Sequence, residues 1–267
     1  MYVAPKKHLG QHFLKDKSIA AQITDCVSQH KGYTKLLEIG AGTGVLTELL
    51  VLKKDIDLSL IEIDNESVKY LKTVLKFPAD KIIEGDILKM NLAQLYDNQL
   101  IGIIGNLPYN ISSQIFFKVL EHKNQVMELV CMIQKEVAER IAAKHGNKTY
   151  GILSVLLQAY YNIEYHFTVH EHVFNPPPKV KSAVITLRRN DVEKLPCNEK
   201  MFFNIVKMGF NQRRKTLRNA LKGIGIATEI IEDKIFDKRA EQLSVQDFIS
   251  LTQMMEKHKI KIHLPLQ

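Results

Sequence analysis

A predicted strand, a glycine turn and the start of a helix, over residues 35–50, place the strongest constraint on the fold of this chain. Three glycines form the turn: Gly40, Gly42 and Gly44. Glycines at such a turn let the backbone approach a ligand closely at the N-terminus of the helix. Apolar runs of strand length recur downstream, at residues 58–61, 81–85 and 100–104. The pattern predicts an α/β domain with a mostly parallel central sheet.

Acidic residues follow the next two predicted strands. Glu62 lies eighteen positions after Gly44, where a carboxylate can accept hydrogen bonds from the ribose of an adenosine-containing cofactor. Asp64 is expected to cap the following helix and is not taken as a ligand. Asp86 ends the third strand and either accepts from an adenine amine or caps a short turn. The GxGxG spacing argues against a dinucleotide cofactor, for which GxGxxG is typical.

The four residues Asn106–Tyr109 follow the fourth strand, so they are expected at the sheet edge where α/β proteins place their chemistry. Pro108 stiffens this loop. Asn106 supplies an amide oxygen as hydrogen-bond acceptor, and Tyr109 supplies a ring on which a base can stack. An oxygen that accepts a hydrogen bond from an adenine amine would localise the lone pair on the amine nitrogen and so favour methyl transfer to it. The alternative is an ordinary proline-containing turn.

Composition limits the class of protein and its partners. The 267 residues carry a formal net charge of +8, which favours a polyanionic partner such as nucleic acid. The three cysteines are scattered and show no CxxC spacing, so we expect a cytoplasmic protein without a disulfide framework or a metal site. No segment has the length and apolarity of a membrane span or a signal peptide. We expect a soluble monomer.

Eight motifs, taken in order, resemble those of the ribosomal RNA adenine N6,N6-dimethyltransferase family, and the bacterial enzymes that modify 16S rRNA resemble this chain most. The motifs are Gly10–Leu14, Glu38–Gly44 with Glu62, Gly85–Asp86, Gly105–Ser112, Gln134–Val137, Tyr150–Val155, Phe174–Val184 and Phe210–Arg218. The match spans nearly the whole chain. It implies a Rossmann-like methyltransferase fold and S-adenosylmethionine as cofactor.

The resemblance also implies roles for single residues. The residues implied to bind the cofactor are His12 and Leu14 through their backbone, Gly40 at the methionine end, Glu62 at the ribose, Asp86 at the adenine, and Asn106. Asn106 would also hold the target amine, with the target base between the rings of Tyr109 and Phe174. His12 departs from the family pattern, because many members carry Asn there. A packing role beside the prolines is the alternative for Phe174.

A helical C-terminal domain is predicted over residues 191–267, after a catalytic domain over residues 1–190. Its basic residues are expected to contact RNA phosphates: Arg213, Arg214, Lys215, Arg218 and Lys222. A solvated charged face is the simpler alternative.

The function that this sequence indicates is dimethylation of two adjacent adenosines in small-subunit rRNA during ribosome assembly. Four alternatives stay open: a non-catalytic RNA-binding assembly factor, a large-subunit rRNA methyltransferase of the macrolide-resistance type, a DNA adenine methyltransferase and a nicotinamide-dependent oxidoreductase.

Overall fold

The computed structural model describes residues 2–224, 226 and 228–258 of the chain. The chain forms two compact units. The first runs from the N-terminus to Ala138 and includes Asn162–Arg189; the second consists of Glu139–Tyr161 and the chain from Asn190 onward.

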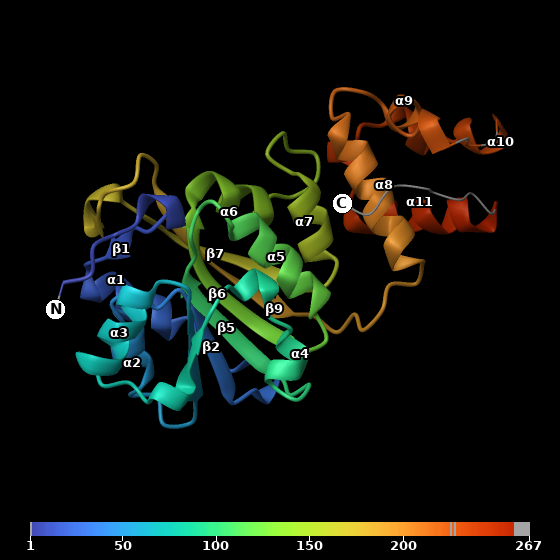
Figure 1. The fold of residues 1–267 in the computed structure, drawn as a ribbon. Helices are drawn as coiled ribbons and strands as arrows, with labels where there is room; N and C mark the ends of the chain where they lie inside the picture. The colour runs from blue at the N-terminus through green and yellow to red at the C-terminus, as the bar shows by residue number, and fades with distance from the viewer. Residues whose placement is uncertain (1, 225, 227, 259–267) are drawn as a thin grey trace. The chain divides into compact units, whose positions relative to one another are not determined.

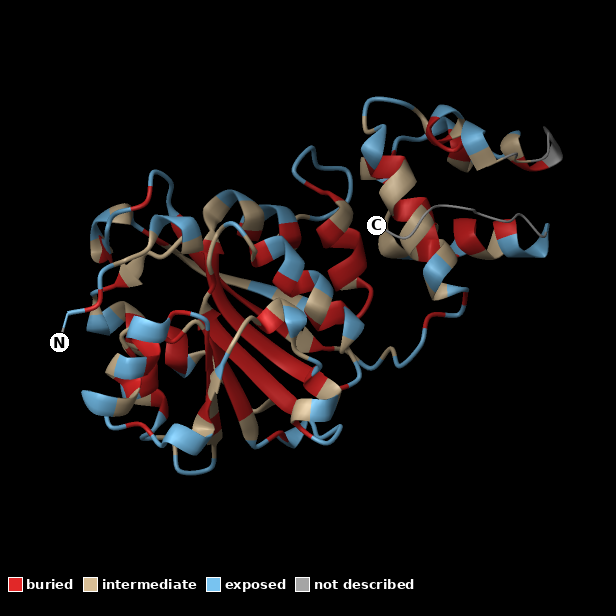
Figure 2. Cartoon of the chain, in the orientation of Figure 1, coloured by how far each residue is buried: buried red, intermediate tan, exposed pale blue. Residues whose placement is uncertain are grey.

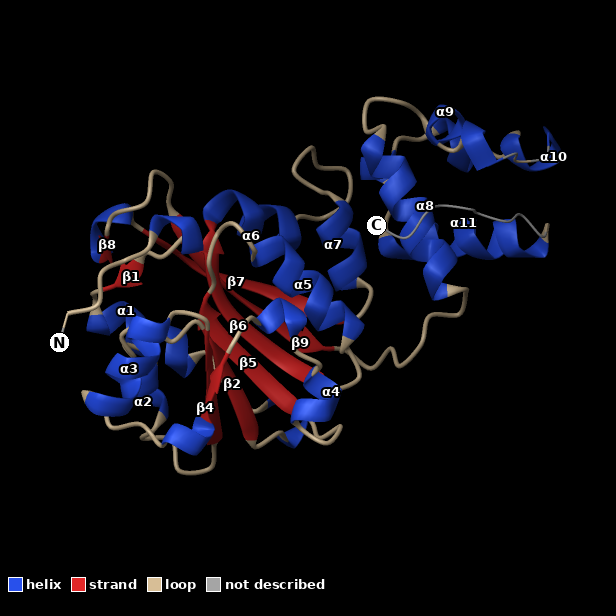
Figure 3. Cartoon of the chain, in the orientation of Figure 1, coloured by secondary structure: helices blue, strands red, loops and turns tan. Residues whose placement is uncertain are grey.

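A seven-stranded sheet forms the centre of the first unit, in the order β4-β3-β2-β5-β6-β9-β7 (Figures 1 and 3). Its strands are β2 (Lys35–Ile39), β3 (Asp57–Glu62), β4 (Ile82–Glu84), β5 (Ile101–Asn106), β6 (Val126–Gln134), β7 (Tyr161–Val169) and β9 (Ser182–Arg189). The strands from β4 to β6 pair in parallel, and β9 pairs antiparallel to β6. The expected mixed α/β fold with a mostly parallel sheet is confirmed.

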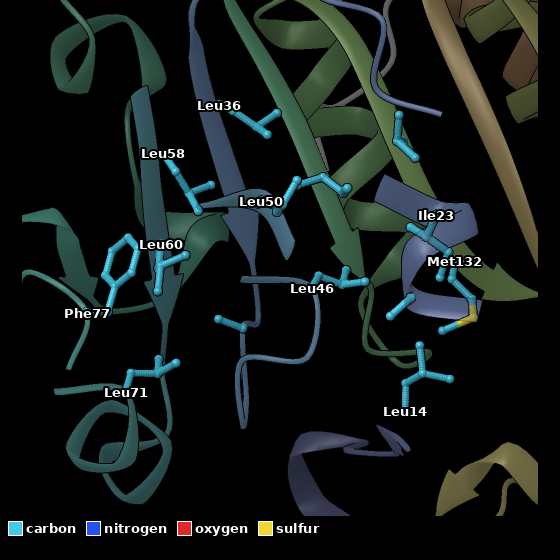
Figure 4. Close-up of a cluster of buried hydrophobic side chains, with 14 of the residues drawn as sticks. Leu14, Ile23, Leu36, Leu46, Leu50, Leu58, Leu60, Leu71, Phe77 and Met132 are labelled. Carbon is cyan, nitrogen blue, oxygen red and sulfur yellow. The ribbon is translucent and has the colours of Figure 1, made fainter. Parts of the chain in front are cut away.

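Helices cover both faces of this sheet. On one side lie α1 (Lys17–Asp25), α2 (Thr47–Leu50) and α3 (Asn65–Thr73), and on the other α4 (Leu92–Leu95) and α5 (Ser112–Glu121) (Figure 1). Strands covered on both faces have to be apolar at successive positions, as β5 and β6 are, and the central strands are buried along most of their length (Figure 2). Leu36, Leu60 and Met132 belong to one hydrophobic cluster that also takes side chains from α1 and α3 (Figure 4).

The first helix is shorter than its sequence pattern predicts. The spacing of apolar residues predicts a helix over residues 18–30, but α1 ends at Asp25. The carboxylate of Glu128, fully buried in β6, accepts from both the backbone N–H (3.0 Å) and the hydroxyl (2.6 Å) of Ser28. It also accepts from the Tyr33 hydroxyl at 2.7 Å and the Arg188 guanidinium at 3.2 Å. These bonds draw the backbone away from a helical path.

The second unit is helical. Its helices are α7 (Ile152–Gln158), α8 (Glu199–Asn211), α9 (Leu217–Ala220), α10 (Thr228–Ile231) and α11 (Val245–Lys257), and α6 (Lys135–Ala142) spans the boundary. Asn198 caps α8 and Ser244 caps α11 through their side chains. Residues 139–161, expected in the catalytic domain, belong to this unit, because α7 packs against α8 and α11.

Among the residues that the structure describes, no helix is long and apolar enough to span a membrane.

Gly102 is expected to tolerate no side chain. A Cβ at this position in β5 would lie 2.2–2.4 Å from three atoms of the Tyr33 side chain, which is buried and hydrogen bonded to Glu128. Such overpacking against a rigid ring costs about 1–3 kcal/mol. Gly102→Ala should therefore lower the free energy of unfolding by about that amount in urea denaturation followed by circular dichroism. Gly223→Ala, where a Cβ meets nothing within 4 Å, is the control. Equal stability of the two variants would contradict this account.

Glu38 makes the stability depend on pH. Its side chain is buried in β2, and this burial raises the pKa of the carboxyl to about 7, although the Thr47 hydroxyl donates to it at 2.7 Å. Because the folded pKa exceeds the unfolded value of about 4.5, the folded state binds this proton more tightly, and stability is lost as pH rises from about 4.5 to 7. The shift corresponds to about 3 kcal/mol.

Glu38→Gln removes this titration and keeps an acceptor for Thr47. We expect the free energy of unfolding of the variant, minus that of the wild type, to increase from pH 5 to pH 8, by at most about 3 kcal/mol. Denaturation at several pH values measures it. A difference that stays constant across this range would show that Glu38 does not titrate there.

Candidate functional site

The glycine turn after β2 leaves space for a ligand beside the backbone. Gly40 has φ +70°, a conformation that favours glycine, and a Cβ built on it would meet no atom within 4 Å. Gly42 has φ +57°, and its N–H donates to the Glu62 carboxylate at 2.9 Å. The turn after β2 is therefore tied to the carboxyl end of β3, and the open side of Gly40 faces unfilled space.

Glu62 is held by the backbone around it. Besides Gly42, the N–H groups of Ile63 and Asp64 donate to its carboxylate, each at 2.9 Å. Burial nevertheless raises the pKa of Glu62, because these three bonds offset the desolvation only in part. A carboxylate has about four acceptor sites. One acceptor site is therefore left for a ligand hydroxyl.

Asp64 caps α3 as expected, accepting from the Glu66 N–H at 3.3 Å. It also pairs with Lys6 and accepts from the Gln11 amide at 3.5 Å. Burial acts to raise the pKa of Asp64, but the hydrogen bonds from Lys6 and Ser67 outweigh it and the pKa is lowered. The Asp64 carboxylate thereby fastens the N-terminal segment beside the end of β3.

Three cavities lie along the N-terminal segment, residues 5–13. The first, of about 130 Å³, is lined by Leu9, Ile39, Gly40, Ile61, Glu62, Ile63, Gly85, Asp86, Ile87, Leu88, Asn110 and Ile111. The second, of about 50 Å³, is lined by the segment 9–13, Gly40, Gly42, Glu62 and the loop 106–109. The third, of about 440 Å³, is lined by Pro5, Lys7, Gly10, Gln11, His12, Tyr109, Gln134 and the segment 176–180.

Asp86 combines the two interpretations that the sequence left open. Its carboxylate accepts from the Leu88 N–H at 2.9 Å and so caps a short 3₁₀ turn. It also lines the first cavity together with Glu62, Ile63 and Ile87. The exposed side chain of Ile63 gives this cavity an apolar surface on which a flat ring can pack.

Asn106 stands at the carboxyl end of β5, as predicted. Its side-chain NH₂ donates to the backbone carbonyl of His12 at 2.9 Å, which leaves its amide oxygen to accept from a ligand. The next residue, Leu107, is held by its N–H, which donates to the Met132 carbonyl at 3.0 Å. The N-terminal segment thus orients the amide that the sequence singled out.

Tyr109 lies at the boundary of the second and third cavities. Its hydroxyl is hydrogen bonded to the Ser182 hydroxyl at 2.5 Å, which fixes the ring. One face stacks on the imidazole of His12, with ring centroids 5.4 Å apart and an interplanar angle of 28°. The ring is half-buried, and burial raises the pKa of its hydroxyl.

Phe174 is buried and does not reach the three cavities. Strand β8 (Phe174–Asn175) pairs antiparallel with β1 (Phe13–Leu14), and Leu14 and Phe174 are partners in that pairing. Both side chains are buried in the hydrophobic cluster, and neither residue lines any of the three cavities. The expected pair of open rings is thus not formed in this structure: Phe174 is a packing residue here, and Leu14 fastens the N-terminal segment to the core.

Sequence reasoning missed several lining residues. Leu9, Asn110 and Ile111 line the first cavity, and Gln134 and Lys179 line the third. Four of these lie inside the motifs of the resemblance and Leu9 lies beside one, but no property of the residues themselves marked them as ligands.

Comparison with known proteins identifies the family of this chain. The family model described as ribosomal RNA adenine dimethylase matches residues 4–257. A protein named ribosomal RNA small subunit methyltransferase A from Cytophaga hutchinsonii is 58% identical over 253 residues, covering 95% of this chain and 98% of its own. One of the same name from Bacteroides thetaiotaomicron is 58% identical over 255 residues and covers 95% of each chain.

Solved structures show the same fold. A dimethyladenosine transferase from Plasmodium falciparum superposes with a TM-score of 0.77 at 26% identity, covering 93% of this chain and 99% of its own. The 23S rRNA methyltransferase ErmE superposes with a TM-score of 0.67 at 22% identity, covering 90% and 99%, which is a likeness of fold alone. The chain therefore belongs to the ribosomal RNA adenine dimethylase family of S-adenosylmethionine-dependent methyltransferases.

Proposed function

We propose that this protein transfers methyl groups to the N6 amines of two adjacent adenosines in small-subunit rRNA, in an assembling ribosomal subunit. The observation that carries the proposal is that three cavities adjoin at the carboxyl ends of the parallel strands. The first and second share Gly40 and Glu62, Asn106 lines the second, and Tyr109 lines both the second and the third. The small-subunit substrate is supported by the names of relatives 58% identical to this chain. Monomeric state and cytoplasmic location stay predictions.

The first and second cavities fit S-adenosylmethionine. Glu62 has an acceptor site left for a ribose hydroxyl, and Asp86 with Ile63 and Ile87 surrounds the space for adenine. The open side of Gly40 suits the methionine end of the cofactor. Gly40 also lines the second cavity, and this cavity extends to Asn106. When bound, this cofactor supplies an electrophilic methyl group.

The protein's part in the reaction is positioning and electrostatics. The Asn106 amide oxygen accepts one N–H of the target amine, because its NH₂ is already held by the His12 carbonyl. This bond would localise the lone pair on the nitrogen of the target amine, and the bound cofactor would supply the methyl group that this nitrogen takes up. The nitrogen then loses its extra proton to water. No covalent enzyme intermediate is needed.

The target base enters through the third cavity. Its volume of about 440 Å³ accommodates a nucleotide, and Lys7 and Lys179 on its wall suit phosphate groups. Tyr109 supplies a stacking surface, which offsets part of the cost of unstacking an adenine from its RNA.

The basic residues of the second unit divide into two groups. Arg213 pairs with Glu241 at 2.8 Å and donates to the carbonyls of Tyr150 (3.1 Å) and Lys148, and Arg218 pairs with Asp237 at 2.7 Å. Arg213 therefore holds the loop that precedes α7. The exposed residues Arg214, Lys215 and Lys222 are better placed to contact RNA phosphates.

Asn106→Ala tests the assigned chemistry. We expect methyl transfer to fall by about 100-fold or more, because one preorganised acceptor is lost, while S-adenosylhomocysteine still binds. Incorporation of labelled methyl groups into under-methylated small subunits and calorimetric titration measure the two effects. His170→Ala, at an exposed residue outside the three cavities, is the matched control. An Asn106→Ala enzyme with unimpaired transfer would refute the role.

The double variant Arg214→Ala/Lys215→Ala tests the RNA surface. Two lost phosphate contacts should weaken binding to small subunits and reduce the slope of log K against log salt by roughly two. The control is Lys200→Ala/Lys257→Ala, which removes two exposed lysines from α8 and α11. Equal salt slopes for both double variants would place the phosphate contacts elsewhere.

A further inference from the structure

The second and third cavities share a wall that contains two aromatic rings. Four residues line both cavities: Gly10, Gln11, His12 and Tyr109. The rings of His12 and Tyr109 are stacked with centroids 5.4 Å apart. Whether the two rings stay stacked determines how a base in the third cavity reaches Asn106, which lines the second cavity.

No base fits between the two rings as they stand. Carbon atoms in contact lie about 3.5 Å apart, so a flat base between two rings needs a separation of about 7 Å. The observed 5.4 Å leaves room for no third ring. A base that stacks on this face of Tyr109 therefore has to take the place of the imidazole.

The contacts of the two side chains show which of them moves. Tyr109 is fixed through its hydroxyl to Ser182, which is fully buried in β9. Apart from the stack, the contacts of the described residues give the His12 imidazole one hydrogen bond, an exposed one of 2.8 Å in which Nδ1–H donates to the Pro176 carbonyl. The His12 backbone is fixed separately, because its carbonyl accepts from Asn106. The imidazole can therefore leave while the backbone and the Asn106 amide stay in place.

We propose that the His12 imidazole is an internal competitor for the base site: it occupies the face of Tyr109 in the free enzyme and leaves when the target adenine binds. The inference rests on the proposed function and adds a specific role to it. His12 acts as a positioning residue with two separable parts. Its carbonyl orients Asn106, and its ring sets how tightly a base has to stack in order to enter.

Removing the ring should therefore tighten base binding, whereas structural damage would weaken it. The probe is adenosine 5′-monophosphate, titrated by calorimetry into the enzyme saturated with S-adenosylhomocysteine. We take the stabilisation from the His12–Tyr109 stack to equal that of other aromatic pairs in proteins. His12→Ala, which has no such stack to break, should therefore bind the nucleotide roughly two- to tenfold more tightly than the wild type. His170→Ala, an exposed histidine outside this wall, should bind it as the wild type does.

A second variant separates the stack from the hydrogen bond. His12→Phe keeps a ring on Tyr109 but loses the bond to the Pro176 carbonyl, so its affinity should lie between those of the wild type and His12→Ala. Affinity of His12→Ala equal to or weaker than that of the wild type would overturn the inference and make the imidazole part of the base-binding wall. Failure of the proposed function would show differently, as wild-type enzyme that transfers no methyl group to small-subunit adenosines.

Discussion

The architecture of the site depends on the hydrogen bonds that the Glu62 carboxylate accepts from three backbone N–H groups. This carboxylate accepts from the glycine turn after β2 and from the two residues that follow β3, so neighbouring parallel strands end in one rigid junction. Asp64 extends this junction to Lys6 and Gln11, and the N-terminal segment then reaches Asn106 through the His12 carbonyl. A series of charge-assisted and amide hydrogen bonds thus leads from the end of β3 to the Asn106 amide.

Periodicity and glycine spacing are local signals, and the features they encode were predictable. The strand ends at Glu62 and Asn106 and the cap at Asp64 follow from apolar runs and capping preferences within a few residues. Asp86 shows the limit of this reasoning. The sequence allowed a cap or a ligand, and the structure shows a cap that also lines the first cavity.

Features that depend on partners distant in the sequence could not be predicted in this way. Phe174 is buried because β8 pairs with β1, about 160 residues earlier, and no local pattern encodes that pairing. The helix α1 ends at Asp25 because Ser28 binds Glu128, 100 residues away. Residues 139–161 group with the second unit because α7 packs against α8 and α11. The expected boundary near residue 190 rests on local composition, which carries no information on this packing.

The burial of Phe174 changes the account of how a base is held. With that ring in the core, the wall between the second and third cavities carries the rings of Tyr109 and His12. One face of Tyr109 is already occupied by the imidazole of His12, whose carbonyl orients Asn106. One short N-terminal stretch therefore lines all three cavities, orients the Asn106 amide and covers one face of the Tyr109 ring. Because these contacts involve neighbouring residues of one segment, a displacement of that segment would change all of them together.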